Sequence, residues 1–240
     1  MRCFVICVAG ILSTFALTCS AASQGSPTRS DSSDWWSLIR REEFPSSERI
    51  TPENRQPAET NFQIAGITLG SPFDFSDIRT KYGEGAEVTR GDAASFRDQM
   101  CYVSPSGDVH LIFEFGEVES VLYLLQGGKG WNGAELCARS NAVSKNSSTA
   151  SGLRLGIAPE QLRSILGNPV VATTEKLIYC FGYRIKTSPE ALAKSRKNYP
   201  EMSDAEFAKN FEYADGYVYI EARFSAGKLN LLAISKSETY

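Results

Sequence analysis

The chain has 240 residues, of which 42 % are hydrophobic and 22 % charged, an ordinary composition for a globular protein with one or two cores. Its formal charge of −3 at pH 7 argues against sequence-independent nucleic-acid binding, which requires a basic field. We therefore expect no nucleic acid among its partners.

The first 22 residues follow the pattern of a signal peptide. Arg2 is positively charged, residues 3–17 are mostly apolar, and residues 20–22 (Ser-Ala-Ala) have the small side chains of a cleavage site. We predict that residues 1–22 are removed and that the mature protein is secreted or periplasmic, with membrane contact only through this segment. An uncleaved anchor is the alternative. Cys19 lacks the flanking residues of a lipidation site, so lipidation is disfavoured.

Residues 23–61 resemble a flexible leader in composition. A Ser-rich stretch is followed by Asp34, which can cap a short helix containing Trp35 and Trp36. A Pro-rich linker from Pro45 to Asn61 then leads to the folded part. The two Trp side chains either dock on the parent domain or anchor a partner.

A short pattern occurs twice in the rest of the chain. In residues 67–83, a strand-like tetrapeptide ending in Gly precedes an amphipathic helix that stops at Gly83. Residues 153–167 repeat this order and stop at Gly167, and a Cys-aromatic pair and an alternating strand follow each copy. The repeat predicts an α+β fold made of two tandem helix-plus-antiparallel-sheet repeats.

We expect repeat one to span residues 62–140, a linker to span 141–152, and repeat two to span 153–240. A helical insertion at residues 187–215 interrupts repeat two. Ser188 is placed to cap its first helix, and Ser203 with Glu206 forms a capping box for its second. Such an insertion is either an embellishment or a functional loop.

Cleavage of the signal peptide would leave Cys101, Cys137 and Cys180. An oxidising compartment favours one disulfide, and the third cysteine is then buried or pairs with another chain. Spacing alone does not decide the pairing. We favour Cys101–Cys137, with Cys180 as a small buried side chain.

Catalytic chemistry has little support in the sequence. The single histidine, His110, is predicted on the outward face of a strand, where a surface role is usual. Glu114, Glu119 and Glu221 could converge on one sheet face, and a hydrolase would need two of them flanking a groove. That alternative is weak, so we predict no enzyme, no catalytic residues, no metal site and no cofactor.

A binding surface is the stronger hypothesis. Tyr217, Tyr219, Glu221 and Arg223 alternate along one strand and share the face opposite its apolar residues, and Tyr with Arg is typical of interface hot spots. His110 and Trp131 complete the hypothetical binding set.

Two alternatives to an open binding surface remain. A neighbouring helix or the insertion could cover this face. A small-ligand or glycan pocket at the repeat junction, lined by Trp131, Tyr217 and Tyr219, would be a different function.

Residues 155–169 begin with Leu-Gly and contain Leu-Arg-Ser-Ile-Leu-Gly-Asn-Pro. This segment resembles the helix motif of the SmpA/OmlA (BamE-like) envelope lipoproteins, and two such units in tandem resemble the β-lactamase inhibitor proteins. The resemblance implies a helix packed on an antiparallel sheet in each unit, and a sheet surface that grips another envelope or extracellular protein. The chain lacks a convincing lipidation cysteine and a cysteine between the helix and first strand of either unit, so a specific role in outer-membrane assembly or in inhibiting β-lactamase does not carry over. We hypothesise more generally an enzyme inhibitor or an envelope-assembly accessory.

Overall fold

The computed structural model describes residues 52–70, 75–90, 97–116, 119–127 and 137–239. The predicted signal peptide, the predicted leader as far as residue 51 with the helix expected around Trp35 and Trp36, and Trp131 lie outside these ranges. None of the described helices has the length and apolar character needed to cross a membrane.

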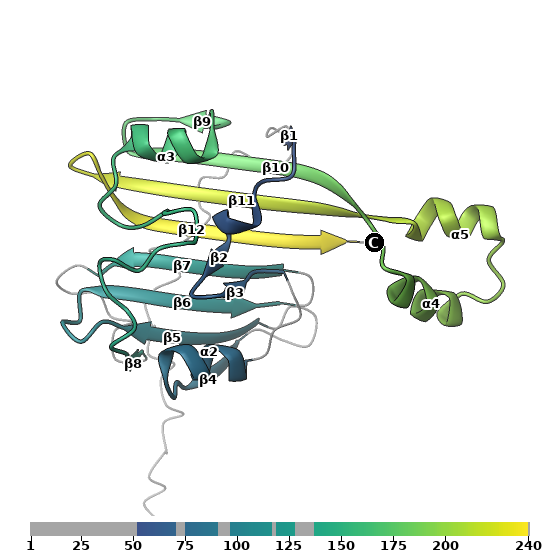
Figure 1. Cartoon of the computed structure of the whole chain (residues 1–240), viewed down its shortest axis with the longest axis horizontal. Coiled ribbons are helices and arrows are strands. Elements are labelled where there is room, and N and C mark those ends of the chain that lie inside the picture. Colours follow the sequence, from purple (N-terminus) through teal and green to yellow (C-terminus); the bar gives the residue numbers. More distant parts are fainter. Residues whose placement is uncertain (1–51, 71–74, 91–96, 117–118, 128–136, 240) are drawn as a thin grey trace, which may run out of the picture.

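The strands of the main sheet are β1 Glu53–Asn54, β4 Glu87–Arg90, β5 Arg97–Val103, β6 Val109–Phe115, β7 Glu119–Gln126, β8 Ala138–Arg139, β9 Val171–Ala172, β10 Lys176–Lys186, β11 Tyr213–Ser225 and β12 Lys228–Thr239. Within the described residues they form one ten-stranded sheet in the order β1-β10-β11-β12-β7-β6-β5-β4, with β9 beside β10 and β8 beside β5 (Figure 1). Neighbours are antiparallel, except that β1 is parallel to β10 and β8 to β5. A separate hairpin of β2 (Gln63–Ile64) and β3 (Ile67–Thr68) follows the 3₁₀ turn η2 (Glu59–Asn61).

The predicted fold class, two tandem helix-plus-sheet repeats, is wrong. β7 and β12 pair from Leu125↔Leu231 to Glu119↔Ser237, so the strands of both halves belong to one continuous sheet. The described chain is mostly β, with a large mixed sheet rather than two units that each have their own. The alternating pattern predicted which strand faces are buried, but it says nothing about which strand edges meet. Pairing at this edge satisfies the backbone groups of both strands.

One face of the sheet carries the main core. Helices α2 (Phe75–Tyr82) and α3 (Pro159–Leu166) pack there through Ile78, Tyr82, Leu162 and Leu166, and Figure 1 shows both helices over the sheet. Pro159 opens α3 where its missing N–H costs nothing, and Gly167 follows its end with φ 88°. Full burial of a Leu or Ile side chain is worth roughly 1.5–3 kcal/mol, so this layer is a main source of stability.

The opposite face is also buried over part of the sheet. Its smaller apolar cluster consists of Ile112, Val121, Tyr123, Leu125 and Leu231 on β6, β7 and β12. As predicted, His110, Ile112 and Glu114 lie on the face opposite Val109, but the prediction that they face outward to solvent is wrong, because all three are buried. Strand β6 is therefore an interior strand on both faces, which period-two alternation does not reveal.

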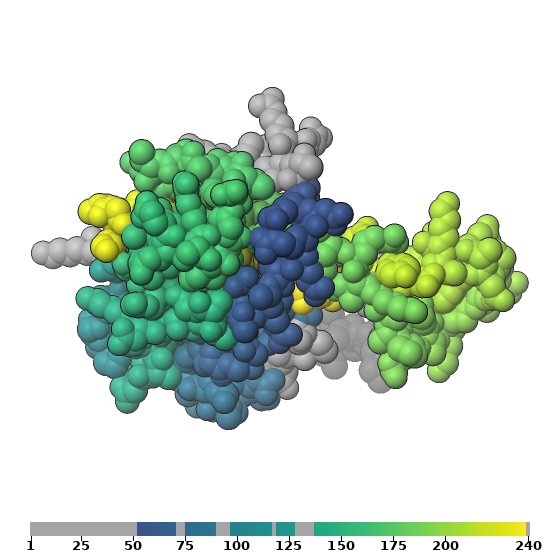
Figure 2. Space-filling view, turned by 45° about the horizontal axis from the view of Figure 1, so that its top comes forward, coloured from purple at the N-terminus to yellow at the C-terminus, as the bar shows by residue number. Residues whose placement is uncertain are grey.

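β10 and β11 carry two helices at one end, α4 (Pro189–Asn198) and α5 (Asp204–Phe211) (Figure 1). We call residues 187–212 the helical arm. Figure 2 shows it as a lobe that projects away from the body of the molecule. The N–H of Thr187 donates to the carbonyl of Glu212 at 2.9 Å and closes the base of the arm.

Both predicted helix caps of the arm are present. Ser188 Oγ accepts a hydrogen bond from the N–H of Ala191, and Ser203 and Glu206 form the reciprocal capping box. No residue of α4 or α5 is buried, so caps and local aromatic contacts stabilise these helices more than core packing does.

The predicted Cys101–Cys137 disulfide is present, with Cα atoms 4.6 Å apart. Cys101 lies on the sheet face opposite Met100 and Tyr102, so the bridge ties residue 137 to the second face of β5. Cys180 is not in a disulfide. It is half-buried rather than fully buried, and burial raises the pKa of its thiol.

Candidate binding face

Strand β11 separates two sets of side chains by strict alternation. Val218, Ile220, Ala222 and Phe224 enter the main core, whereas Tyr217, Tyr219, Glu221 and Arg223 project from the other face. Tyr179, Phe181 and Tyr183 of β10 also enter the main core, which decides the orientation of β10 that the sequence left open. The described helices α2 and α3 pack on the core face, so neither covers the tyrosines.

The neighbours of the tyrosines on this face are small. Tyr217 lies between Gly182 and Ser237 in the register, and Tyr219 lies between Cys180 and Ser235. A Cβ on Gly182 would lie 3.1 Å from the Cβ of Pro52 but at an ordinary 3.5 Å from the ring of Tyr217, so the glycine makes room for Pro52 rather than for that ring. Tyr217 is 42 % exposed, and its ring offers contact area to a partner.

β11 begins at Tyr213, within the residues predicted as the helical insertion, and this adds Tyr213 to the same face. Tyr213 is 39 % exposed, and the guanidinium of Arg184 lies over its ring at 4.7 Å from the centroid. Arg184 Nε is also 3.6 Å from a carboxylate oxygen of Asp215. The alternation Tyr213, Asp215, Tyr217 was the available signal, but Asp215 and Gly216 resemble a turn.

Glu221 and Arg223 form an ion pair on the face itself, with 2.6 Å between Nε and Oε1. Glu221 is buried and Arg223 is half-exposed. The buried carboxylate therefore fixes the position of the guanidinium on this face of the sheet. We call the set Tyr213, Tyr217, Tyr219, Glu221 and Arg223 the tyrosine face. Its members are rigidly spaced because they stand on one central strand.

His110 is not part of the tyrosine face. It lies on the same side of the sheet, in the row that runs from Arg223 through Leu231 and Leu125 to His110. The two leucines separate it from Arg223. His110 is 1 % exposed, and its burial lowers the pKa of the imidazole to about 4, against a smaller opposing effect of Asp108.

The three glutamates considered for hydrolysis do not form one site. Arg97 Nη1 is 2.5 Å from Glu114 and 3.2 Å from Glu119, and Gln99 donates to Glu114 at 3.2 Å. Glu221 instead pairs with Arg223. Burial disfavours the charge of Arg97, but Glu114 and then Glu119 outweigh it and raise its pKa. Arg97 thus binds Glu114 and Glu119 together, whereas a glycosidase needs two carboxyl groups that flank a groove.

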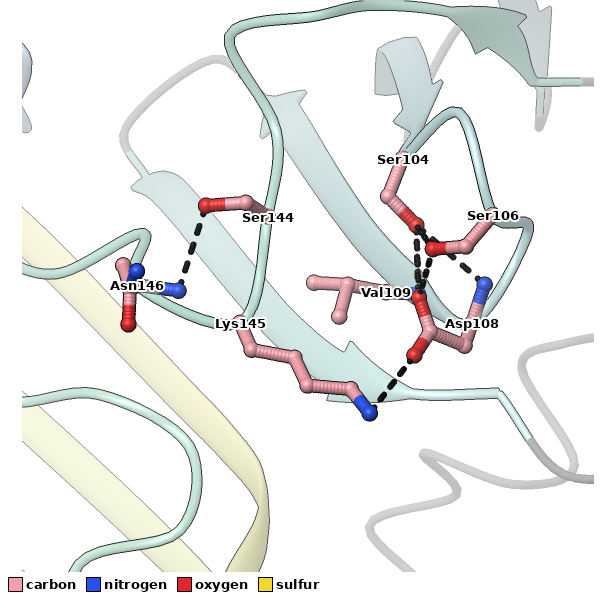
Figure 3. A network of polar contacts seen from close by, with 7 residues as sticks. All are labelled: Ser104, Ser106, Asp108, Val109, Ser144, Lys145 and Asn146. Atoms are coloured by element: carbon pink, nitrogen blue, oxygen red, sulfur yellow. Dashed lines mark hydrogen bonds and ion pairs between the residues drawn. The ribbon is translucent and has the colours of Figure 1, made fainter.

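A polar cluster that the sequence did not point to lies at the β5–β6 turn (Figure 3). Asp108 accepts hydrogen bonds from Ser104, at 2.9 Å, and from Ser106, and its other oxygen is 3.0 Å from Lys145 Nζ. Ser104 Oγ in turn accepts from the N–H of Val109 at 3.1 Å. These contacts lower the pKa of Asp108, and the hydrogen bond from Ser106 has the largest effect. A carboxylate with a lowered pKa is a weak base, so this cluster is suited to stabilising the turn rather than to catalysis.

The arm carries a hollow of about 460 Å³ near its tip. We call it the arm hollow; its lining residues are Asn198, Tyr199, Pro200, Glu201, Met202, Glu206 and Asn210. Within the described ranges, no group of three or more His, Cys, Asp or Glu side chains is arranged to hold a metal ion.

Comparison with known proteins returned no match: no protein-family model, no curated protein and no solved structure resembles this chain at a significant level.

Proposed function

We propose that this chain is an exported protein-binding module that holds another envelope or extracellular protein against the tyrosine face. The observation that carries the proposal is the row of Tyr213, Tyr217 and Tyr219 with Arg223 on one side of β11, beside small residues of β10 and β12. Tyr and Arg are the residue types that contribute most at interfaces, because they combine large contact area with polar groups at low entropic cost.

The geometry favours a flat protein surface over a small ligand. Tyr213 and Tyr217 are exposed on the sheet, whereas ligand sites are concave and enclose most of the ligand surface. The proposed role is that of a binding protein, such as an inhibitor or an assembly accessory, rather than an enzyme.

Export is part of the same proposal. The signal-like residues 1–22 support it, and the Cys101–Cys137 disulfide is of the kind that persists in secreted and periplasmic proteins. Mass spectrometry of the mature N-terminus in an exported fraction would test this half independently. A chain that retains residues 1–22 inside the cell would contradict it.

The binding half is tested with three forms of the protein: wild type, Tyr217→Ala, and Tyr217→Ala/Tyr219→Ala/Arg223→Ala. Partners are captured from envelope and secreted fractions, purified, and titrated by calorimetry. We expect the single change to weaken binding about tenfold and the triple change to abolish stoichiometric capture. The single variant matters because Tyr217 is exposed and its truncation leaves the core intact.

The matched control is Lys81→Ala/Arg163→Ala/Val170→Ala, which removes three exposed side chains outside the tyrosine face. It should bind like wild type. Equal affinity of wild type and the triple tyrosine-face variant would sink the proposal, as would the absence of any stoichiometric partner.

A further inference from the structure

The two halves of the helical arm carry opposite charge. Helix α4 has three cations and one anion, a formal charge of +2. Residues 199–212, from the end of α4 through α5, have four anions and one cation, a formal charge of −3. A projecting lobe with one positive and one negative side is electrostatically complementary to a second copy of itself.

Only part of this charge is used inside the arm. Arg196 pairs with Asp204, donates to the carbonyl of Met202 at 2.6 Å, and lies over the ring of Phe207 at 4.5 Å. Lys194 and Lys197 are exposed, and within the described residues neither has a carboxylate at ion-pair distance. Glu201 is likewise exposed and outside the ion pairs of the arm.

The acidic side also has a shape that suits a long cationic side chain. The arm hollow contains Glu201 and Glu206 and no Lys or Arg, and it lies beside Tyr199, which is 48 % exposed. An ammonium group there meets carboxylates and an aromatic ring, both of which attract it. The hollow begins at Asn198, the residue after Lys197, so the basic and acidic sites are close together at the arm tip.

We propose that two copies of this chain associate through their arms, with Lys194 and Lys197 of each copy set against the arm hollow of the other. A two-fold axis makes this arrangement reciprocal, since each copy presents the same basic and acidic patches to its partner. The interface is small and charged, so the dimer is weak and sensitive to salt. This inference does not rest on the tyrosine face.

The first experiment measures the mass of the full exported chain by sedimentation velocity over a wide concentration range. We expect a reversible monomer–dimer equilibrium at low salt. At about 1 M NaCl, where the Debye length is about 3 Å, we expect monomer. A chain that stays monomeric at every concentration in low salt overturns the proposal.

The second experiment swaps the charges. One variant is Lys194→Glu/Lys197→Glu, and the other is Glu201→Lys/Asn210→Lys; Glu206 is left alone because it caps α5. Each variant alone should have a dissociation constant raised about tenfold or more, and an equimolar mixture should regain a dimer of one chain of each kind. Restoration by mixing is a result that misfolding cannot produce.

The control Lys81→Glu/Lys228→Glu makes the same charge change at two exposed lysines, one on α2 and one at the start of β12. It should dimerise like wild type. A wild-type dimer that survives both charge swaps, or a mixture of the swapped variants that stays monomeric, overturns the arm interface. Capture of the partner by the tyrosine face is measured on the same variants and should be unchanged, which separates failure of this inference from failure of the proposed function.

Discussion

At the scale of single residues, the burial of His110 changes its chemistry. A Cβ on Gly127 would lie 2.5 Å from His110 Cε1, so the imidazole lies directly against the backbone of the chain leaving β7. In this position charging the ring is costly, which is why its pKa falls to about 4. The side chain is therefore neutral at physiological pH and acts as a packing residue.

Because of this environment, we predict that His110 makes the free energy of unfolding depend on pH. The imidazole of the unfolded chain has a pKa near 6.5 and that of the folded chain near 4, so between these values the unfolded state binds more protons. The stability contributed by neutral His110 is complete above about pH 6.5 and is lost as the pH falls toward 4. His110→Gln should reduce the slope of unfolding free energy against pH in this window by up to about 1.4 kcal/mol per pH unit.

Urea unfolding of both forms at several pH values between 4 and 7.5 measures the two slopes. The variant is expected to be less stable at neutral pH, but the change of slope is the diagnostic quantity. Identical slopes for wild type and His110→Gln would contradict this account. They would show that the folded and the unfolded chain bind the His110 proton equally well, so that burial does not lower the pKa of the imidazole.

At the scale of elements, the Asp108 cluster joins two segments that the sequence analysis assigned to separate parts of the chain. The β5–β6 turn contributes Ser104, Ser106 and Asp108, and the segment predicted as a linker contributes Lys145 (Figure 3). Val143 of the same segment is fully buried in the main core, so the predicted linker packs on the sheet, and the Lys145–Asp108 ion pair adds an exposed contact to this packing.

Asp108→Asn should destabilise the protein by about 1–2 kcal/mol at pH 7, because a carboxylate that accepts several hydrogen bonds becomes a neutral amide. The folded-state pKa of Asp108 is lowered, so its contribution is present above the unfolded value near 3.9 and is lost as the pH falls through the folded value. The difference between wild type and variant should thus narrow below about pH 4. Glu175→Gln, at an exposed turn carboxyl, should have almost no effect. A difference that is constant with pH would contradict this account.

Local features of the elements could be predicted from the sequence. The arm helices could be predicted from Ser188, Ser203 and Glu206, because helix capping depends only on residues close in the sequence. The two faces of β11 could be predicted from the alternation of apolar and polar residues. The Cys101–Cys137 pair and the side-chain direction of Tyr217 and Tyr219 also agree with the structure.

Apart from the Cys101–Cys137 disulfide, features that depend on distant partners could not be predicted. The pairing of β7 with β12, the burial of His110 and Glu114, and the Lys145–Asp108 contact each join segments far apart in the chain. No local pattern encodes them. The start of β11 at Tyr213 was missed for a different reason, since Asp215 and Gly216 favour a turn unless a neighbouring strand pairs with them.

At the scale of the whole molecule, the structure separates a body with two buried layers from an arm with none. The main core and the smaller cluster both lie in the body. The arm residues instead contact one another, as in the stacked rings of Phe207 and Phe211, 4.8 Å apart. Stability should therefore come from the body, and the arm should be available for association.

Replacing residues 188–211 with Asn-Gly tests this division. The chain ends that the deletion leaves, Thr187 and Glu212, already share a backbone hydrogen bond, and Asn-Gly suits a tight hairpin turn. Because no residue of α4 or α5 is buried, the melting temperature should shift by less than about 4 °C. The shortened chain should keep its partner on the tyrosine face and lose self-association.

Calorimetry of the shortened chain measures the shift, and Leu162→Ala provides the comparison. That change empties a fully buried position of α3 and should cost about 2–5 kcal/mol. If removing the arm lowers the melting temperature as much as Leu162→Ala does, the arm contributes to the folding of the body. If the melting temperature shifts little and only self-association disappears, the arm does not contribute to the stability of the body. Its role is then to bind a second copy of the chain.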